Sequence, residues 1–375
     1  MPDALLPAAP PPAADDPDGL TEPFAPAVEP GRPVLTWRQV AFPLVLSLVA
    51  IAVAIWATYE PGAFALMRSA LRPGYLALAV GALALQQCVA AWRIHYVARG
   101  ELSFGKALRG QFTWDFLSGV TPSAIGGGPL AAVFIARENQ IPLGRSTAMI
   151  LYLMVADLVW FATLVLTLLL ASTQVQLFPD SIGAIGAGTM TLFFVALLVW
   201  ASFFTYATLV RPTVLERLLR WIVRLRPFRR FEGRVGDELV RLRRQSEVLR
   251  GRSVGFFVGA VAISAGMWVC RYLVLLFVAW SVTPGLDVGL FMLRAASLWL
   301  TILVMPTPGG AGGMEAMYVL FLGSLLPDGF IGPALLTWRL MAYYVVVGIG
   351  FGIASSTLGE MLLARRAARA SRAAR

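Results

Sequence analysis

Two apolar stretches of the chain are interrupted by the same short pattern, which is Thr-Pro, three further residues, and Gly-Gly. The pattern covers residues 121–127 and occurs again at residues 307–313. Proline and paired glycines end a helix, and in lipid the backbone groups that they free must be satisfied within the protein. Two copies in corresponding halves of the chain predict a duplicated membrane fold with its working site at the two breaks.

The composition agrees with a location in the membrane. Of the 375 residues, 58% are hydrophobic and 14% are charged, and the mean hydropathy is +0.72. A soluble domain does not have such a composition, so we expect a polytopic membrane protein. Stretches of roughly 20 apolar residues indicate transmembrane helices, which are expected at residues 40–58, 74–93, 146–171, 183–209, 254–280 and 332–358.

Shorter apolar segments flank each break. Residues 104–119 and 127–137 surround the first break, and residues 288–305 and 313–326 surround the second. Each segment is short for a full span, so each pair predicts a re-entrant hairpin of two half-helices. The expected fold is therefore all-α, a polytopic membrane protein with six transmembrane helices and two re-entrant helical hairpins arranged as an inverted repeat.

Arginine placement sets the expected orientation, because cytoplasmic loops carry an excess of positive charge. The segment 211–252 contains thirteen arginines and the tail 365–375 contains five, whereas the loops 172–181 and 281–287 contain none. Both termini are therefore expected in the cytoplasm. The basic residues around the first hairpin predict that it enters from the cytoplasm, and the same reasoning predicts that the second enters from outside.

The expected domain organisation follows from these assignments. A membrane domain covers residues 37–360, with repeat one at 40–171 and an inverted repeat two at 183–358. Residues 1–36 are rich in Pro, Ala and Asp and are expected to form a disordered cytoplasmic tail, and residues 361–375 a basic cytoplasmic tail. The arginine-rich connector 211–252 is expected to be an amphipathic helix at the headgroup level; a solvated charged connector is the alternative. The expected location is the bacterial cell inner membrane.

Charged side chains inside apolar spans are costly, and they usually mark functional positions. Asp157, Arg271 and Arg339 lie within spans, and Arg294 and Glu315 belong to the second hairpin. One interpretation is a polar cavity that binds an anionic headgroup, in which Asp157 and Glu315 balance charge or carry protons. The other is a set of structural ion pairs, and Arg271 has the further option of extending to the membrane surface.

Two other features concern the same site. Arg93 ends its span beside Trp92 and is expected to anchor that span at the interface. At the breaks, N–H groups of a half-helix that starts at Gly127 or Gly313 can bind a phosphate or carboxylate, although a tight hairpin tip that only packs is the alternative. The candidate substrate-binding residues are Thr121, Pro122, Gly126, Gly127, Gly128, Arg294, Thr307, Pro308, Gly309, Gly310, Gly312, Gly313, Glu315 and Arg339.

Several classes of chemistry lack the residues that they require. The chain has one histidine, His95, and two cysteines, Cys88 and Cys270, which cannot form a zinc site or a catalytic Cys-His system. No nucleophile-base pair is evident, so an enzyme is not expected. No metal or cofactor is expected either, and no motif supports nucleic-acid binding.

The two breaks also carry a family resemblance. Residues 121–129 (Thr-Pro-Ser-Ala-Ile-Gly-Gly-Gly-Pro) and 306–315 (Pro-Thr-Pro-Gly-Gly-Ala-Gly-Gly-Met-Glu) resemble the signatures of the flippase-like family, typified by the membrane region of lysylphosphatidylglycerol synthases. The resemblance covers about residues 40–360 and implies movement of lipids across the inner membrane. Many members carry an acidic residue and an arginine after the first Gly-Gly, where this chain has Gly128-Pro129 and Ala131-Ala132. We expect no soluble aminoacyl-transferring domain in this chain, so it is not expected to act as a synthase alone.

These observations lead to one expected function and two alternatives. We expect an inner-membrane lipid translocase that moves an amphiphilic lipid, with an anionic headgroup, by alternating access between the two hairpins. The alternatives are a secondary transporter of a small anionic solute, and a non-transporting membrane partner of a separately encoded lipid-modifying enzyme. The lipid (phospholipid, glycolipid or hopanoid), the direction, the energy source and the oligomeric state stay open at this point.

Overall fold

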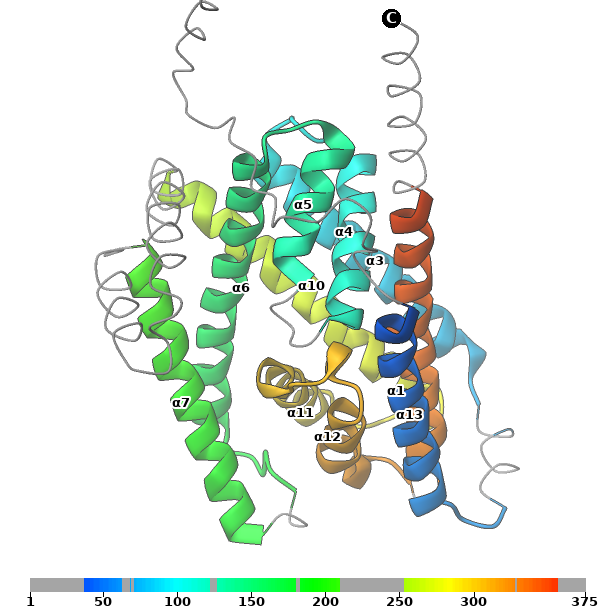
Figure 1. Cartoon of the computed structure of the whole chain (residues 1–375). Helices are drawn as coiled ribbons and strands as arrows, with labels where there is room; N and C mark the ends of the chain where they lie inside the picture. The colour runs from blue at the N-terminus through cyan, green and yellow to red at the C-terminus, as the bar shows by residue number, and fades with distance from the viewer. Residues whose placement is uncertain are drawn as a thin grey trace, which may run out of the picture.

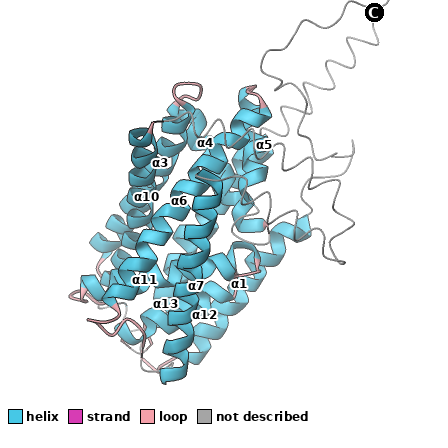
Figure 2. Cartoon of the chain, turned by 90° about the vertical axis from the view of Figure 1, so that its left-hand side faces the viewer, coloured by secondary structure: helices cyan, strands magenta, loops and turns pink. Residues whose placement is uncertain are grey.

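The part of the chain that the structure describes consists mainly of helices joined by short loops. This computed structural model describes residues 37–62, 68, 71–121, 127–179, 183–209, 253–327 and 329–356. No strand occurs within these ranges (Figures 1 and 2), so the prediction of an all-α fold is confirmed. The predicted tails at 1–36 and 361–375 and the connector at 211–252 lie outside the described residues.

Six long helices begin and end close to the predicted boundaries. They are α1 (Trp37–Ala57), α3 (Pro73–Ala98), α6 (Leu143–Ala171), α7 (Gly183–Leu209), α10 (Val254–Trp280) and a final helix that begins as α13 (Ile331–Arg339) and continues to Ser356. Five of these, among the described residues, are long and apolar enough to cross a membrane. In α1 the apolar part, Ala41–Ala57, is shorter, so the predicted count of six spans depends on this helix.

Four shorter helices occupy the positions of the predicted hairpins. The first pair consists of α4 (Phe104–Val120) and α5 (Gly127–Asn139), and the second pair of α11 (Val288–Thr301) and α12 (Gly313–Leu322). At 1.5 Å per residue these helices are roughly 15–26 Å long, less than the ~30 Å hydrocarbon core of a bilayer. Short polar side chains start two of them, since Ser103 accepts a hydrogen bond from an amide in the first turn of α4 and Asp287 does the same for α11.

The helices pack around one antiparallel crossing. Helix α3 makes its most extensive contact with α10, and the end of each helix meets the start of the other, because Tyr96 stacks on Phe256 and Tyr75 lies against Trp280. Helix α7 packs chiefly on α6, and α1 packs on α13. Figure 1 shows the first helix pair in the upper part of the molecule and the second pair in the lower part.

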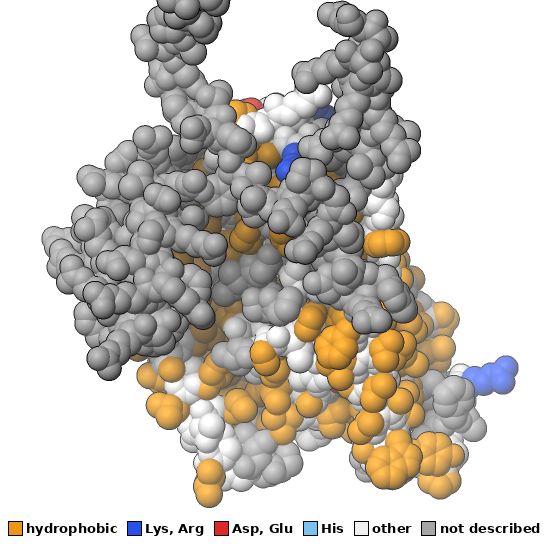
Figure 3. Space-filling view, viewed as in Figure 1, with side chains coloured by type: hydrophobic (Ala, Val, Ile, Leu, Met, Phe, Trp, Pro, Cys, Tyr) orange, Lys and Arg blue, Asp and Glu red, His pale blue; other side chains and the backbone are white. Residues whose placement is uncertain are grey.

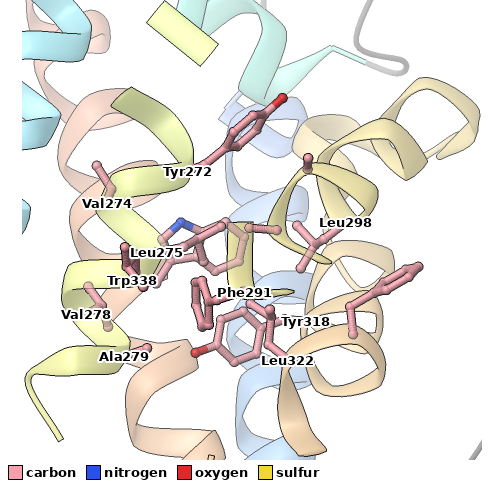
Figure 4. Packing of buried hydrophobic residues seen from close by; sticks show 14 of the residues in the cluster. Tyr272, Val274, Leu275, Val278, Ala279, Phe291, Leu298, Tyr318, Leu322 and Trp338 are labelled. Carbon is pink, nitrogen blue, oxygen red and sulfur yellow. The ribbon is translucent and has the colours of Figure 1, made fainter. Parts of the chain in front are cut away.

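Two clusters of buried apolar side chains hold this arrangement together. One lies among α3, α4, α5 and α6, and the other joins α10 to the second helix pair and to α13. In the latter, Trp338 stacks on Tyr318 with ring centroids 5.5 Å apart, and Phe291 is fully buried beside them (Figure 4). The second helix pair is therefore held in place by aromatic packing as well as by the loops that join it to α10 and α13.

The outer surface is apolar. Trp56 on α1 and Ile185 on α7 are 81% and 88% exposed, and Figure 3 shows hydrophobic side chains over the lower part of the visible face. In water, so large an exposed apolar surface would drive association. A hydrocarbon environment removes this penalty, which agrees with a multi-pass membrane protein.

Candidate polar cavity between the two helix pairs

A cavity of about 490 Å³ lies where the two helix pairs meet. The first pair contributes Ser118 and Gly119 to its lining, and the second break contributes Gly309 and Gly310. The hydroxyl of Tyr343, from the final helix, donates a hydrogen bond to the carbonyl oxygen of Gly119 at 3.1 Å. A Cβ atom on Gly309 would lie 2.9 Å from that same oxygen. The second break therefore lies against the end of α4, directly before the first break.

The second break needs its glycines for two different reasons. Gly309, Gly310 and Gly312 have φ angles of +60°, +68° and +82°, a left-handed conformation that side chains disfavour. Gly313, which starts α12, has ordinary backbone angles, but a Cβ there would overlap the sulfur of Met305. Four glycines in five residues thus permit a sharp reversal and a close approach of the chain to itself.

The remaining candidates at the second break do not line the cavity. Pro308 starts a short 3-10 turn, Pro308–Gly310. The hydroxyl of Thr307 is buried and has no hydrogen-bond partner among the described residues. Of the predicted residues in this break, only Gly309 and Gly310 border the cavity.

The first break is used for packing where the structure describes it. Helix α5 begins at Gly127, as predicted, and a Cβ at this position would overlap the side chain of Ser118 in α4. A Cβ at Gly128 would lie 3.0 Å from the sulfur of Met154. The hydroxyl of Thr121 donates back to the carbonyl oxygen of Leu117 at 2.6 Å. These contacts favour the packing interpretation here; Pro122 and Gly126 lie outside the described residues.

Arg93 is a central residue of the cavity rather than an interfacial anchor. Its side chain is 3% exposed, and one terminal nitrogen lies 2.6 and 2.7 Å from the two carboxylate oxygens of Asp157. The indole N–H of Trp268 donates to the same carboxylate at 3.2 Å. The expectation that Arg93 anchors its span at the surface is wrong, because a carboxylate 64 residues later in the chain is available to pair with it.

Arg271 also faces the cavity, with an unusual set of neighbours. Its guanidinium lies over the indole rings of both Trp268 and Trp299, at 4.7 and 4.8 Å from their centroids. The nearest carboxylate, on Asp115 in α4, is 4.0 Å away. Cation–π contacts stabilise a cation without neutralising it, so Arg271 keeps most of its capacity to attract an anion.

Arg339 and Glu315 form a buried pair beside the second break. The Nε atom of Arg339 lies 2.9 Å from Glu315, and the two side chains are 4% and 1% exposed. Glu315 also accepts hydrogen bonds from the Gly312 amide, at 2.8 Å, and from the hydroxyl of Ser47 in α1. The Arg339 Nη2 atom has no hydrogen-bond partner among the described residues, and its side chain lines the cavity.

Arg294 lies away from the cavity. It donates to the backbone oxygens of Gln176 and Leu177, at 3.0 and 3.1 Å, and to the hydroxyl of Ser324 at 2.7 Å. These groups belong to the loop after α6 and to the end of the second helix pair. A buried arginine that satisfies several oxygens in this way holds the loop and the helix pair together. The structure therefore does not bring Arg294 together with Arg339.

The cavity contains polar residues that were not among the predicted site residues. Gln111, Asp115 and Ser118 line it from α4. They recur at intervals of four and three residues, which places them on one face of the helix. A polar face on an otherwise apolar half-helix can be recognised in the sequence, and it indicates residues that face a polar cavity. Gln87 of α3 donates to the Asp115 carboxylate at 3.1 Å and so links α3 to α4.

The charges of the described cavity are close to balance. Arg93 is matched by Asp157 and Arg339 by Glu315, while Arg271 and Asp115 are separated by 4.0 Å. No group of three or more His, Cys, Asp or Glu side chains occurs among the described residues at a spacing that suits a metal ion. The chemistry available is therefore hydrogen bonding, ion pairing and aromatic contact.

The fold and the cavity define a class of protein. Long apolar helices, an apolar exterior and buried ion pairs around a central cavity are those of a multi-pass α-helical membrane protein. Within this class the chain belongs to the family described as the lysylphosphatidylglycerol synthase TM region, whose model matches residues 42–350. The resemblance inferred from the two breaks is thereby confirmed. No curated protein matches the chain.

Proposed function

We propose that the protein moves an anionic lipid across the bilayer, with the headgroup passing through the cavity between the two helix pairs. The observation that carries this proposal is the presence of Arg271 and Arg339 at the cavity. Arg271 is weakly paired, because its carboxylate partner Asp115 is 4.0 Å away. The Nη2 atom of Arg339 has no hydrogen-bond partner among the described residues. A phosphate would complete the hydrogen bonding of both guanidinium groups. Membership of a family named for a lipid synthase supports a lipid as the substrate.

The cavity lining also suits an amphiphile. Near the arginines lie glutamine and aspartate side chains, and elsewhere the lining consists of apolar residues such as Leu151, Met154 and Phe161 on α6. Trp200 and Phe204 extend the lining to α7, whose outer face is exposed. A polar centre next to an apolar wall can hold a headgroup and the first part of its chains together.

Alternating access is proposed from the pattern of helix contacts. If the two halves form an inverted repeat, α3 corresponds to α10, α1 to α7 and α6 to α13. The packing of α3 on α10 then joins equivalent helices, and the packing of α6 on α7 corresponds to that of α13 on α1. In this proposal the short pairs are re-entrant hairpins, and movement of one repeat against the other opens the cavity to either side.

The first experiment measures lipid movement by the purified protein in vesicles. Fluorescent phosphatidylglycerol is placed in both leaflets, and dithionite reports the fraction that reaches the outer leaflet. Arg271→Gln removes a cation whose nearest carboxylate, on Asp115, lies 4.0 Å away and keeps a hydrogen bond from Gln87, so folding should be retained. A charge-assisted hydrogen bond contributes about 1.5–3 kcal/mol, so the rate should fall by at least tenfold.

The matched control is Arg145→Gln, because Arg145 has a 46% exposed side chain and lies outside the cavity. It should move lipid at the wild-type rate. A wild-type rate for the Arg271 variant would refute the headgroup role. Vesicles that take up a soluble anion but move no lipid would favour the solute transporter, and inactivity together with co-purification of a lipid-modifying enzyme would favour the partner protein.

A further inference from the structure

Asp115 has the most weakly paired carboxylate at the cavity. It accepts a hydrogen bond from Gln87 at 3.1 Å, and the guanidinium of Arg271 lies 4.0 Å away. This second distance allows electrostatic attraction but exceeds that of a hydrogen bond. Asp157 and Glu315, in contrast, each combine an arginine at hydrogen-bond distance with a further donor. Asp115 therefore has the least support for its negative charge.

A hydrogen-bond acceptor without a donor lies one helical turn from Asp115. The side-chain oxygen of Gln111 is buried and accepts no hydrogen bond within the described ranges, and the residue is 2% exposed. Gln111 precedes Asp115 by four positions on α4, and both line the cavity. Glutamine and aspartate side chains at this spacing can form a hydrogen bond. An ionised carboxylate only accepts hydrogen bonds, whereas a protonated one also donates, so protonation of Asp115 would supply the missing donor.

The charges described at the cavity balance before any lipid binds. Three arginines face three carboxylates, which are Arg93, Arg271 and Arg339 against Asp115, Asp157 and Glu315. The phosphate of a lipid such as phosphatidylglycerol adds a negative charge. When this phosphate binds Arg271, as in the proposed function, Asp115 is left beside a second anion. Two negative charges at one site disfavour ionisation, so one of the groups takes up a proton.

The other titratable groups near α4 are less suited to take up this proton. Those that line the cavity around Asp115 are Arg93 of α3, Asp157 of α6, Arg271 of α10, and Arg339 and Tyr343 of the final helix. Elements packed on α4 add Glu138 of α5, which pairs with Arg109 outside the cavity, and Arg38 at the start of α1. Asp157 keeps Arg93 when a phosphate binds. Glu315 keeps its partner too, because the phosphate can use Nη2 of Arg339 while Nε stays beside Glu315.

From this arrangement we propose that Asp115 is a proton-binding site, which takes up a proton when a lipid phosphate binds Arg271. The proton forms an O–H bond on a carboxylate oxygen of Asp115, and this group donates to the side-chain oxygen of Gln111. Arg271 exchanges its distant carboxylate for charge-assisted hydrogen bonds to the phosphate. The Asp115 side chain is 18% exposed, so water can deliver the proton. This inference rests on the proposed function and specifies the ion that binds together with the lipid.

The test measures proton uptake on binding, which does not require transport. Purified protein in weakly buffered mixed micelles receives phosphatidylglycerol, a pH-sensitive dye reports the protons taken up, and protein-free micelles give the blank. Linkage then predicts uptake of about one proton per bound lipid, and an affinity that falls by up to about tenfold for each unit of rising pH. Phosphatidylethanolamine brings an ammonium that can neutralise Asp115 directly, so it should cause no proton uptake.

Asp115→Asn tests the site, because asparagine has the shape of a protonated aspartate and cannot titrate. This variant should bind phosphatidylglycerol without proton uptake and with an affinity that does not change with pH. Glu101→Gln is the matched control, since Glu101 pairs with Arg145 outside the cavity; it should take up protons as the wild type does. The melting temperature of each variant shows whether its fold is retained.

Each outcome decides the inference. Phosphatidylglycerol that binds the wild type without proton uptake would overturn it while leaving lipid movement in vesicles intact. Uptake that persists in Asp115→Asn would assign the proton to another group, and an affinity that depends on sodium rather than on pH would assign the charge balance to a metal cation; either result would overturn it. If Asp115→Asn does not fold, the proton count of the wild type with the two lipids still decides. If no lipid is bound and none is moved, the proposed function fails, and the inference fails with it.

Discussion

The ion pair between Glu315 and Arg339 makes the most quantitative prediction about stability. Both side chains are less than 5% exposed, and removal of one partner from a buried pair typically costs about 3–5 kcal/mol. The two residues differ in the stabilising interactions that each keeps after its partner has been replaced. Glu315 would keep the Gly312 amide, the Ser47 hydroxyl and a position in the first turn of α12, where the helix dipole favours a negative charge.

Arg339 would keep much less. Its guanidinium lies 5.1 Å from the ring centroids of Trp338 and Tyr343, contacts that contribute up to about 2 kcal/mol when desolvated. Glu315→Gln should therefore destabilise the protein by about 3–5 kcal/mol. Arg339→Gln should destabilise it less, by roughly 2–3 kcal/mol, because the remaining carboxylate keeps several stabilising groups.

Reversible unfolding in mixed micelles, followed by tryptophan fluorescence, gives the free energies of the wild type, both single variants and the double variant. The double variant should be more stable than the sum of the single effects predicts, by about 1–3 kcal/mol. Additive single effects, within about 0.5 kcal/mol, would refute the pairing. A larger loss for Arg339→Gln than for Glu315→Gln would refute the account of how Glu315 is stabilised.

Two further predictions concern the contact of the second break with α4 and the ion pair between Arg93 and Asp157. Gly309→Ala should lower the melting temperature, since the residue has φ +60° and its Cβ would lie 2.9 Å from the Gly119 oxygen; Gly255→Ala, at an open position, should not. Asp157→Asn should also destabilise the protein, by about 3–5 kcal/mol, because Arg93 is left as a buried unpaired charge. A wild-type melting temperature for Gly309→Ala would contradict the close approach of Gly309 to Gly119. The same result for Asp157→Asn would contradict the ion pair with Arg93.

The sequence was a good guide to the elements of the fold. Hydrophobic runs predicted the long helices, and the glycines and prolines located both breaks, because helix length and helix termination depend on local chemistry. The start of α5 at Gly127 and the start of α12 at Gly313 were both expected. What these patterns could not indicate was which charged residues meet, since that depends on packing between distant helices.

Arg93 and Arg294 both illustrate this limit. Arg93 was expected at the membrane surface but lines the cavity, and Arg294 was expected at the binding site but lies away from the cavity. Arg93 lies near the end of its helix, a position typical of an interfacial anchor, yet its partner Asp157 comes from α6. Arg294 lies inside an apolar segment, a position typical of a binding residue, yet its partners are mainly backbone oxygens of a loop 117 and 118 residues away. Every residue has a backbone oxygen, so a sequence does not show which of these oxygens accept hydrogen bonds. The structural role of Arg294 could therefore not be predicted from the sequence.

The pairing of Arg93 with a later helix has a consequence for how the protein is made. During synthesis α3 emerges before Asp157, which follows 64 residues later, and well before Ser264, which follows after 171. An arginine near the end of a helix can meanwhile extend to the membrane surface. Arg93 must then withdraw from water as α6 and α10 dock against α3. The polar centre is therefore built by association of helices already in the membrane, and not during their insertion.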